Sequence, residues 1–300
     1  IVLNVAPVKT SNFTWDLTFN WSNPYSEVTR LARDVPSLSL SGFVEPQVRA
    51  IVGQPYRTLY GLRWARDDAG NILIDDDPSN TIMDGFPFSD PEQQAMGAVS
   101  PDWTSGITNT FSWKSLTFSA LIDIKKGGLM WNGTRGALYY FGTHKDTERR
   151  GEEKVWTGVY GHINADGDLE HYNTPFDPGS GITTGSGADN TESVVIDEDW
   201  YAWDGEGSIF TGPSEPYVEE SGWVRLREVT LVYSFPGSFI DNTPIRKLEL
   251  YFTGINLWLN TPYTGVDPET SLVGNNNGLG LDYFNNPGVK SYTFGLRLGF

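Results

Sequence analysis

Acidic side chains are the groups in this sequence that could most readily carry out chemistry, because they gather at two places along the chain. Two carboxyl groups held at a fixed separation are what glycoside hydrolysis requires. The alternative is that both groups belong to solvated, acidic loops, as runs of charge usually do, and we favour this interpretation. The residues concerned are Asp67, Asp68, Asp75, Asp76 and Asp77 in the first group and Asp197, Glu198 and Asp199 in the second.

Two further patterns suggest a metal site, but both are incomplete. Residues 164–168 resemble the start of a calcium-binding loop, yet Glu170 comes too early to supply the last ligand of such a loop. Gly167 between two aspartates favours a hairpin turn instead. No histidine has a second histidine at the i, i+4 spacing of a zinc site, and their order gives no Ser-His-Asp arrangement; the three are His144, His162 and His171. The sequence therefore predicts no catalytic group, no metal and no cofactor.

Aromatic residues in the longest polar stretch could take part in ligand binding. Their ring faces stack on sugar rings and on peptide side chains. The alternatives are packing within the loop or contact with a partner protein. The candidate ligand contacts are Tyr139, Tyr140, Phe141, Trp200, Tyr201 and Trp203.

The composition excludes several classes of protein. The net charge of −17 argues against nucleic-acid binding and against a polybasic membrane anchor. The chain has no cysteine, so disulfides and thiolate–metal sites are excluded. It has no run of about 18 apolar residues, and therefore no predicted transmembrane helix. The mean hydropathy is low at −0.35, but a transmembrane barrel would also give a low value because its strands alternate and its loops are polar.

The elements that position these groups are predicted to be β-strands, because the pattern that recurs along the chain has a period of two. Between residues 13 and 21, five large apolar side chains share one face and polar side chains share the other. A soluble sandwich would need a deep core to bury them, whereas on a barrel wall they contact lipid. Beyond Gly254 the alternation weakens, which indicates a β-bulge. The seven expected strands are residues 1–9, 13–21, 102–113, 116–125, 224–235, 247–259 and 291–300.

The connections between these strands alternate in length. Short turns are expected near Thr10, Lys114 and Gly237, and the long polar stretches are residues 22–101, 126–222 and 260–290. Outer-membrane barrels have short periplasmic turns and long outer loops. We therefore expect an all-β fold, an antiparallel transmembrane β-barrel of which this chain holds about the last seven strands. Since seven strands in lipid would leave two costly unpaired edges, the other strands are expected from an earlier part of the polypeptide or from another chain. A start at Ile1 without Met agrees with this expectation.

Five motifs in the last third of the chain occur in an order that resembles the C-terminal signature of SusC/RagA-type TonB-dependent transporters. Earlier stretches, such as residues 101–103, are similar too, so the resemblance extends over the whole chain. The motifs are residues 224–231 (VRLREVTL), 253–257 (TGINL), 263–269 (YTGVDPE), 282–288 (DYFNNPG) and 291–296 (SYTFGL).

The resemblance implies a barrel of 22 strands in the outer membrane of a Gram-negative bacterium. It also implies a plug domain and a TonB-contacting segment, neither of which is found in this chain, and a SusD-like surface lipoprotein over the outer mouth. The implied cargo is an oligosaccharide or an oligopeptide. Charged residues on the polar faces of the strands would line the lumen or pair with the plug; these are Asp16, Asp123, Lys125, Glu228 and Arg297. The chain ends with Tyr292, Phe294 and Phe300, which resemble the signal that barrel-insertion machinery recognises.

We therefore expect a nutrient importer and not an enzyme. One alternative is a passive porin or structural barrel without TonB coupling. Another is a soluble all-β carbohydrate-binding domain, which would bury the apolar face of residues 13–21 in a dry core.

Overall fold

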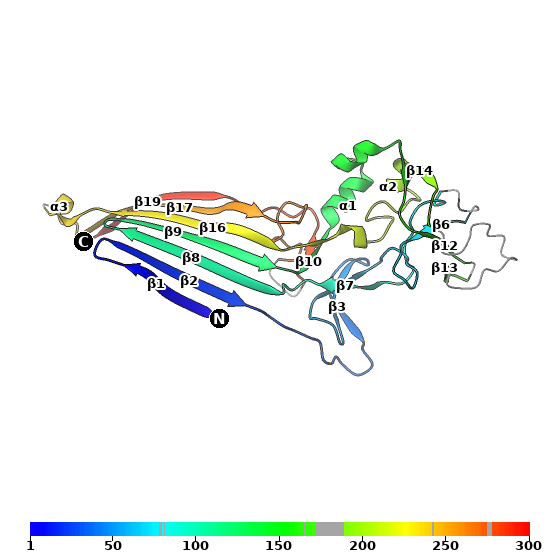
Figure 1. The fold of residues 1–300 in the computed structure, drawn as a ribbon, viewed down its shortest axis with the longest axis horizontal. Helices are drawn as coiled ribbons and strands as arrows, with labels where there is room; N and C mark the ends of the chain where they lie inside the picture. Colours follow the sequence, from blue (N-terminus) through cyan, green and yellow to red (C-terminus); the bar gives the residue numbers. More distant parts are fainter. Residues whose placement is uncertain (78–79, 81, 165, 172–188, 242, 275–277) are drawn as a thin grey trace.

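The computed structural model describes residues 1–300 except 78–79, 81, 165, 172–188, 242 and 275–277. Figure 1 shows a long, curved sheet at one end and a group of small sheets and short helices at the other. We call the second part the head; it consists of the described residues of the segments 23–102, 127–222 and 261–290.

The long sheet has seven strands, each hydrogen-bonded to its neighbours in an antiparallel manner. Their order in the sheet follows their order in the sequence, so the sheet is a meander. The strands are β1 (Val2–Lys9), β2 (Phe13–Ser22), β8 (Trp103–Trp113), β9 (Leu116–Lys126), β16 (Trp223–Ser234), β17 (Lys247–Asn260) and β19 (Ser291–Gly299). The predicted number and positions of the strands are confirmed.

The two faces of the long sheet differ sharply in character. One row of directly paired residues crosses six strands and is entirely apolar: Trp15, Phe111, Phe118, Leu231, Phe252 and Phe294. The adjacent row, which points to the other face, is entirely polar: Asp16, Thr110, Ser119, Thr230, Thr253 and Thr293. Hydroxyl groups bond across the strands in this polar row, for example Thr230 to Thr253 at 3.0 Å. We call the two sides the apolar face and the polar face.

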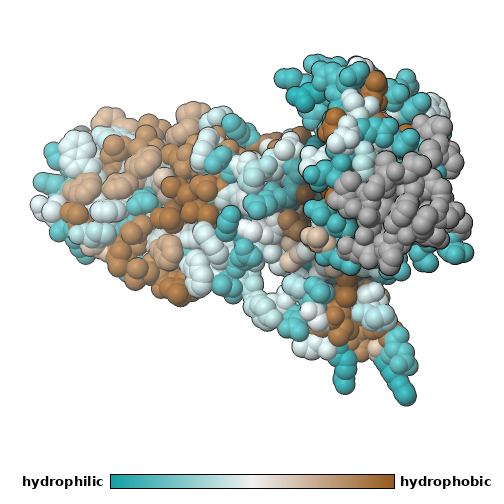
Figure 2. Space-filling model, turned by 45° about the vertical axis from the view of Figure 1, so that its right-hand side comes forward, coloured by the Kyte–Doolittle hydropathy of each residue, from teal (hydrophilic) through white to brown (hydrophobic). Residues whose placement is uncertain are grey.

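The apolar face is not covered by other parts of the chain. Phe294 is 77% exposed, and neither buried hydrophobic cluster among the described residues includes a residue of this face. Figure 2 shows hydrophobic residues over the long sheet and mainly hydrophilic residues over the head. An apolar band of this extent is typical of a lipid-facing surface and disfavours a soluble sandwich with a dry core.

The bulge expected near Gly254 is confirmed. Leu226 pairs with Trp258 but Glu228 pairs with Ile255, so β17 has one more residue than β16 over this interval. Asn256, within the bulge, has a positive φ of 55°. Bulges bend a strand and change the direction of its side chains.

The short connections lie at the end of the sheet away from the head. Residues 10–12 join β1 to β2, residues 114–115 join β8 to β9, and α3 (Gly237–Ile240) lies between β16 and β17. The C-terminus lies at the same end (Figure 1). The three long segments all meet at the opposite end, where they form the head.

The long segments are folded and are not simply polar loops. They form four small sheets, and their strands are β3 (Ser37–Gly42), β4 (Gln47–Ile51), β5 (Thr58–Gly61), β6 (Leu73–Asp75), β7 (Gln94–Ala98), β10 (Leu129–Asn132), β11 (Glu152–Val155), β12 (Val159–Ile163), β13 (Leu169–His171), β14 (Ser193–Ile196), β15 (Val218–Glu220) and β18 (Leu281–Asp282). Two of the pairings, β10 with β18 and β6 with β12, are parallel and join segments far apart in the sequence. The hairpin turn predicted at Gly167 is confirmed, since β12 and β13 pair on either side of it.

Helices are short and occur mainly in the head. Those of the head are α1 (Gly133–Tyr140), α2 (Glu198–Tyr201) and the 3₁₀ helices η1 (Lys145–Arg149) and η2 (Glu215–Tyr217). None of the helices in the described part of the chain is long and apolar enough to cross a membrane.

Two hydrophobic clusters hold the head together. One surrounds Trp200 and includes Leu73 and Phe86. The other surrounds Trp131 and includes Leu59 and Leu281. Tyr139 packs against both clusters, so α1 links them.

Candidate functional site

A cavity of about 640 Å³ lies in the head, next to the Trp200 cluster. Its volume is within the range of small-molecule sites, which is roughly 300–1,000 Å³. Six aromatic residues contribute to its wall: Trp64, Tyr139, Trp156, Trp200, Tyr201 and Tyr217. Charged residues of both signs complete the lining, namely Arg135, Asp146, Arg149, Glu152, Glu153, Lys154 and Glu206. We call this the aromatic cavity.

Trp200 is the centre of the aromatic wall. Its ring stacks on Phe86 at a centroid distance of 4.8 Å and on Trp64 at 6.1 Å, and Trp156 lies tilted at 5.2 Å. Asp197 starts the short helix α2 by accepting a hydrogen bond from the Trp200 backbone N–H at 3.2 Å. An aspartate just before the first helical turn commonly accepts such a bond and so caps the N-terminus of the helix. The local helix start and the ring stack together fix one side of the cavity.

Arg135 and two tyrosines form another side of the cavity. The Asn132 side chain caps α1 by accepting a bond from the Arg135 backbone N–H. The Arg135 guanidinium lies 5.6 Å and 5.5 Å from the ring centroids of Tyr139 and Tyr217, and it forms an ion pair with Glu219 at 2.6 Å. Burial, together with a hydrogen bond donated to a nearby carboxylate, raises the pKa of Tyr139 to about 12. Both tyrosines are therefore neutral hydrogen-bond donors at physiological pH.

Glu206 lies in a tight turn that wraps around Trp200. The backbone N–H groups of Gly205 and Gly207 donate to the Asp199 and Trp200 carbonyls. A Cβ at Gly205 would lie 2.4 Å from the Trp200 Cα, and one at Gly207 would lie 2.5 Å from the Trp200 indole nitrogen. Both positions therefore require glycine because the chain approaches Trp200 so closely. This turn directs the Glu206 carboxylate to the cavity lining.

The six aromatic residues predicted to contact ligand fall into different surroundings. Tyr139, Trp200 and Tyr201 line the aromatic cavity. Tyr140 and Phe141 instead pack with Phe210, with centroid distances of 5.1 Å and 6.2 Å. Trp203 does not line the cavity and is 66% exposed. Ligand contact by these six remains a prediction, and the structure favours the first three.

The acidic groups considered for glycoside hydrolysis have structural roles in the head. Asp67 accepts bonds from the Ala69 and Asn71 backbone N–H groups and so closes a turn. Asp75 accepts from the Asn80 side chain at 2.8 Å, and burial raises its pKa to about 6. The Asp76 carboxylate Oδ1 lies 3.2 Å from Nδ1 of the His162 imidazole. Asp197 caps α2, as described above. In the second acidic group, Asp197 therefore caps a helix. In the first, Asp67 and Asp75 stabilise the segment around β6.

The five charged residues predicted to face the lumen all lie on the polar face. The register places Asp16 opposite Thr110 and Asp123 opposite Gly106. In the same way Lys125 lies opposite Thr104, Glu228 opposite Leu121 and Arg297 opposite Glu249. Lys125 donates to Ser221 at 2.9 Å, so it also contacts the head. Whether this face lines a transport path remains a prediction.

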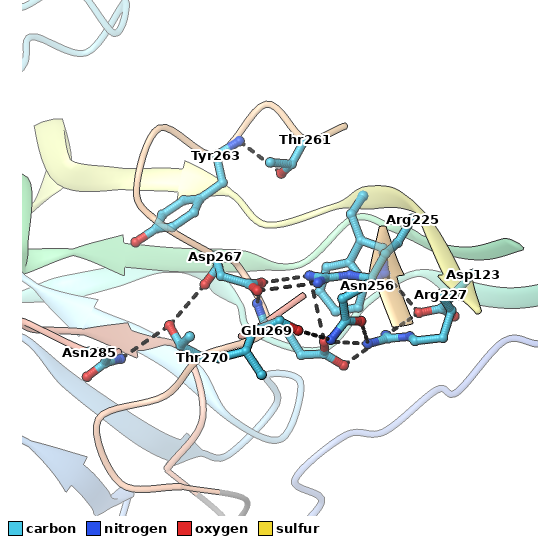
Figure 3. A network of polar contacts seen from close by, with 12 residues as sticks. Asp123, Arg225, Arg227, Asn256, Thr261, Tyr263, Asp267, Glu269, Thr270 and Asn285 are labelled. Atoms are coloured by element: carbon cyan, nitrogen blue, oxygen red, sulfur yellow. Dashed lines mark hydrogen bonds and ion pairs between the residues drawn. The ribbon is translucent and has the colours of Figure 1, made fainter. Parts of the chain in front are cut away.

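An ion-pair network joins the polar face to the head where β16 enters it (Figure 3). Arg225, only 3% exposed, donates two hydrogen bonds to Asp267, at 2.7 Å and 3.3 Å. Arg227 bonds Glu269 at 2.7 Å and 2.9 Å and Asp123 at 2.5 Å. Burial alone would raise the pKa of Asp267, but the hydrogen bonds from Arg225 hold it below its ordinary value. Paired donors of this kind give arginine its geometric specificity for carboxylates.

Reasoning from the sequence did not identify Arg225, Arg227, Asp267 or Glu269 as a group. The four residues belong to the motifs at 224–231 and 263–269, which lie about 40 residues apart in the chain but meet in space. The signal in the sequence was the combination of two arginines with two acidic residues in two of the motifs that carry the resemblance. Alternation alone could not reveal it, because the head segment that supplies Asp267 has no strand period.

The residues of the predicted assembly signal lie at the edge of the long sheet. Tyr292 and Phe294 point to the apolar face of β19, in register with Gly254 and Phe252. Phe300, immediately after β19, is 75% exposed. Recognition of these residues by an insertion machinery remains a prediction.

Comparisons with known proteins agree with this geometry. No protein-family model matches the chain. Among curated proteins, TonB-dependent receptors P3 and P26 of Formosa agariphila are 24% and 25% identical to it over 99% of its length. The chain spans only 28% of the length of each of these relatives.

Solved structures of the RagAB peptide transporter match the whole chain. One has a TM-score of 0.58 at 18% identity, and the chain covers 28% of its matched chain. The 'open-open' and 'closed-closed' states of the importer give 0.56 and 0.58 at 17% and 18% identity, with 28% and 29% of the matched chains covered. The long sheet thus has the fold of part of a RagAB-type antiparallel barrel wall. The chain is thus similar in sequence to a part of these TonB-dependent receptors and similar in fold to a part of the RagAB chains.

Proposed function

We propose that this chain forms part of the wall and the outer binding region of a TonB-dependent nutrient importer in the outer membrane of a Gram-negative bacterium. The observation that carries the proposal is the pair of adjacent rows across six strands, one apolar and one polar. A strand with lipid on one side and a hydrated interior on the other requires both rows, and no buried cluster of the described residues includes the apolar row. The relatives named above are receptors and transporters rather than enzymes, which also supports the proposal.

The cargo of this importer is an oligosaccharide or an oligopeptide that first binds in the head. The aromatic cavity has the size and the mixed polar and aromatic lining that such ligands require. The residues Tyr139, Trp200 and Tyr201 contribute ring faces to it. After release from the head, the cargo passes along the polar face of the wall.

Energy and closure come from parts of the importer outside this chain. A plug domain within the barrel, contacted by TonB from the periplasm, opens the path, and a SusD-like lipoprotein covers the outer mouth. The head is the part of this chain that would meet the lipoprotein, because it lies opposite the short turns and the C-terminus (Figure 1). The ion-pair network fixes the segment 261–274 to the wall while cargo and partner act on the head.

Growth and co-purification experiments test the proposal. A strain without the gene should fail to take up one class of oligosaccharide or peptide, and a strain without TonB should show the same defect. The protein extracted from outer membranes in mild detergent should carry a lipoprotein with it. Uptake that continues without TonB would favour a passive porin, and a detergent-independent soluble protein would overturn the proposal entirely.

A further inference from the structure

Glu206 is a carboxylate in the cavity wall that has no cationic partner among the described residues. Its Oε2 accepts a hydrogen bond from the Ser89 hydroxyl at 2.6 Å. The Ser89 backbone N–H also lowers the pKa of this carboxylate, but no cationic side chain forms an ion pair with it within the described part of the chain. Burial raises the pKa of Glu206 to about 7. A carboxylate in this position therefore lacks a compensating positive charge.

Other partly buried glutamates of the head are satisfied in a different way. Glu215 pairs with Arg63 at 3.0 Å and with Arg66 at 2.8 Å. Although burial acts to raise the pKa of Glu215, these arginines hold it below its ordinary value. Glu45 has no cation but accepts one bond on each oxygen, from Leu62 and Ser214. Glu206 differs from Glu215 in having no cationic partner, and from both in its position in the wall of the aromatic cavity.

The surrounding rings are arranged to stabilise positive charge. The Lys154 ammonium lies 3.1 Å from the centroid of the Trp156 ring, and the Arg135 guanidinium lies over Tyr139 and Tyr217. Cations are attracted to the faces of such rings, most strongly where water is excluded. The Trp156 indole N–H is buried and has no acceptor among the described residues. It could donate to a carbonyl oxygen of a ligand that lies in the cavity.

We propose that the aromatic cavity selects oligopeptide cargo through a protonated amino group, and that Glu206 binds this ammonium. The inference rests on the proposed import function and adds the class of cargo. An ammonium would supply the positive charge that Glu206 lacks, and Trp156 would donate to a peptide carbonyl. A neutral oligosaccharide has no charge to pair with Glu206, and an acidic one would be repelled by it.

Two chemically matched peptide mixtures test the inference. A Lys-C digest of casein is either reductively dimethylated, which keeps the charge of each amine, or acetylated, which removes it. The detergent-solubilised protein from outer membranes is incubated with both mixtures carrying different isotope labels. Retained peptides without arginine are then quantified by mass spectrometry. We expect the wild-type protein to retain dimethylated peptides about tenfold or more in excess of acetylated ones.

The variant Glu206→Gln should lose this preference, because it keeps the acceptor for Ser89 but not the charge. Glu148→Gln, which removes an exposed carboxylate that does not line the cavity, should retain the preference. The comparison of the two mixtures on the wild-type protein does not depend on how any variant folds. Together these outcomes would support Glu206 as the site of amine recognition.

Three outcomes would overturn the inference. Equal retention of the two mixtures by the wild-type protein is the first, and an unchanged preference in Glu206→Gln is the second. The third is retention of neutral oligosaccharides with neither peptide mixture, which would leave the importer proposal intact. The importer proposal itself is tested separately, by the uptake and co-purification experiments above, and would fail if deletion of the gene caused no defect in the uptake of any oligosaccharide or peptide.

Discussion

The ion pair between Arg225 and Asp267 gives a prediction whose size follows from the structure. Asp267→Asn keeps the shape of the side chain but removes the charge that compensates a buried guanidinium. Breaking a buried ion pair from one side costs about 3–5 kcal/mol. Glu269 lies 3.6 Å from Arg225 and retains part of the compensation, so we take the lower limit. At about 1.4 kcal/mol per tenfold change, about 3 kcal/mol corresponds to a factor of roughly 150.

Hydrogen exchange measured by mass spectrometry reports this change locally. The Glu269 N–H donates to the Asp267 carboxylate at 3.0 Å and the Thr270 N–H donates to the Asp267 carbonyl at 3.2 Å. In the Asp267→Asn variant, we expect the segment 261–274 to exchange about 100-fold faster, while peptides from β2 and β8 stay unchanged.

Glu269→Gln is the matched control within the same network. Its carboxylate is 44% exposed, and exposed ion pairs contribute only about 0.2–1 kcal/mol, so exchange should accelerate by about fivefold at most. Equal effects of the two substitutions, or less than about fivefold acceleration in Asp267→Asn, would refute the view that a buried pair anchors the head to the wall.

Four further predictions concern the wall and the head. Phe252→Arg should destabilise the protein folded in lipid vesicles by about 2–4 kcal/mol and so lower the folded fraction. The neighbouring Thr253→Arg on the polar face should destabilise it far less. Removal of Phe300 should lower the amount of protein in the outer-membrane fraction, measured by immunoblot against a variant with an added charge in the loop 114–115. Trp200→Ala should destabilise the head by about 3–5 kcal/mol and expose it to limited proteolysis, without changing the β-sheet signal of the wall. Because burial raises the pKa of Glu206 from 4.5 to about 7 and that of Asp75 to about 6, the head should become progressively less resistant to hydrogen exchange, relative to the intrinsic rate, as the pH rises from 5 to 7, and Glu206→Gln should remove only the part of this dependence that comes from Glu206.

The wall was predictable from the sequence because of its environment. A strand between lipid and water must alternate over its whole length, as residues 13–21 do, so its period is visible without knowledge of its neighbours. The number of strands, their boundaries to within a few residues and the bulge beyond Gly254 all followed from this pattern. The assignment of Asp16 and Arg297 to the polar face followed in the same way.

The head was not predictable in this way, because its contacts join distant parts of the chain. Glu215 binds Arg63 and Arg66, about 150 residues earlier, and β10 pairs with β18 about 150 residues later. Strands of two to six residues are too short to show a period. Helix α1 was missed because its eight residues have two glycines, which disfavour helices, and its start depends on a side-chain cap from Asn132.

For the aromatic residues, too, the sequence could not predict which side chains come together in the fold. Their enrichment in the segment 126–222 was visible, but not which of them line one cavity. Trp200 and Phe141 belong to the same segment, 59 residues apart in the sequence. In the fold, Trp200 lies in the core of the head, whereas Phe141 is 63% exposed. Glu206 could not be singled out among the many acidic residues of the chain, because its place in the cavity wall and its lack of a cationic partner among the described residues are properties of the fold.

Site-directed spin labelling tests most directly whether the long sheet is part of a barrel wall. The chain has no cysteine, so Phe252→Cys and Thr253→Cys each introduce a single labelling site into it. In the protein reconstituted in lipid, our account predicts that the label at 252 is relaxed mainly by oxygen dissolved in the bilayer. The label at 253 should be relaxed mainly by a water-soluble nickel chelate. Equal access of the nickel chelate to both positions would contradict the account, because the apolar row would then face water.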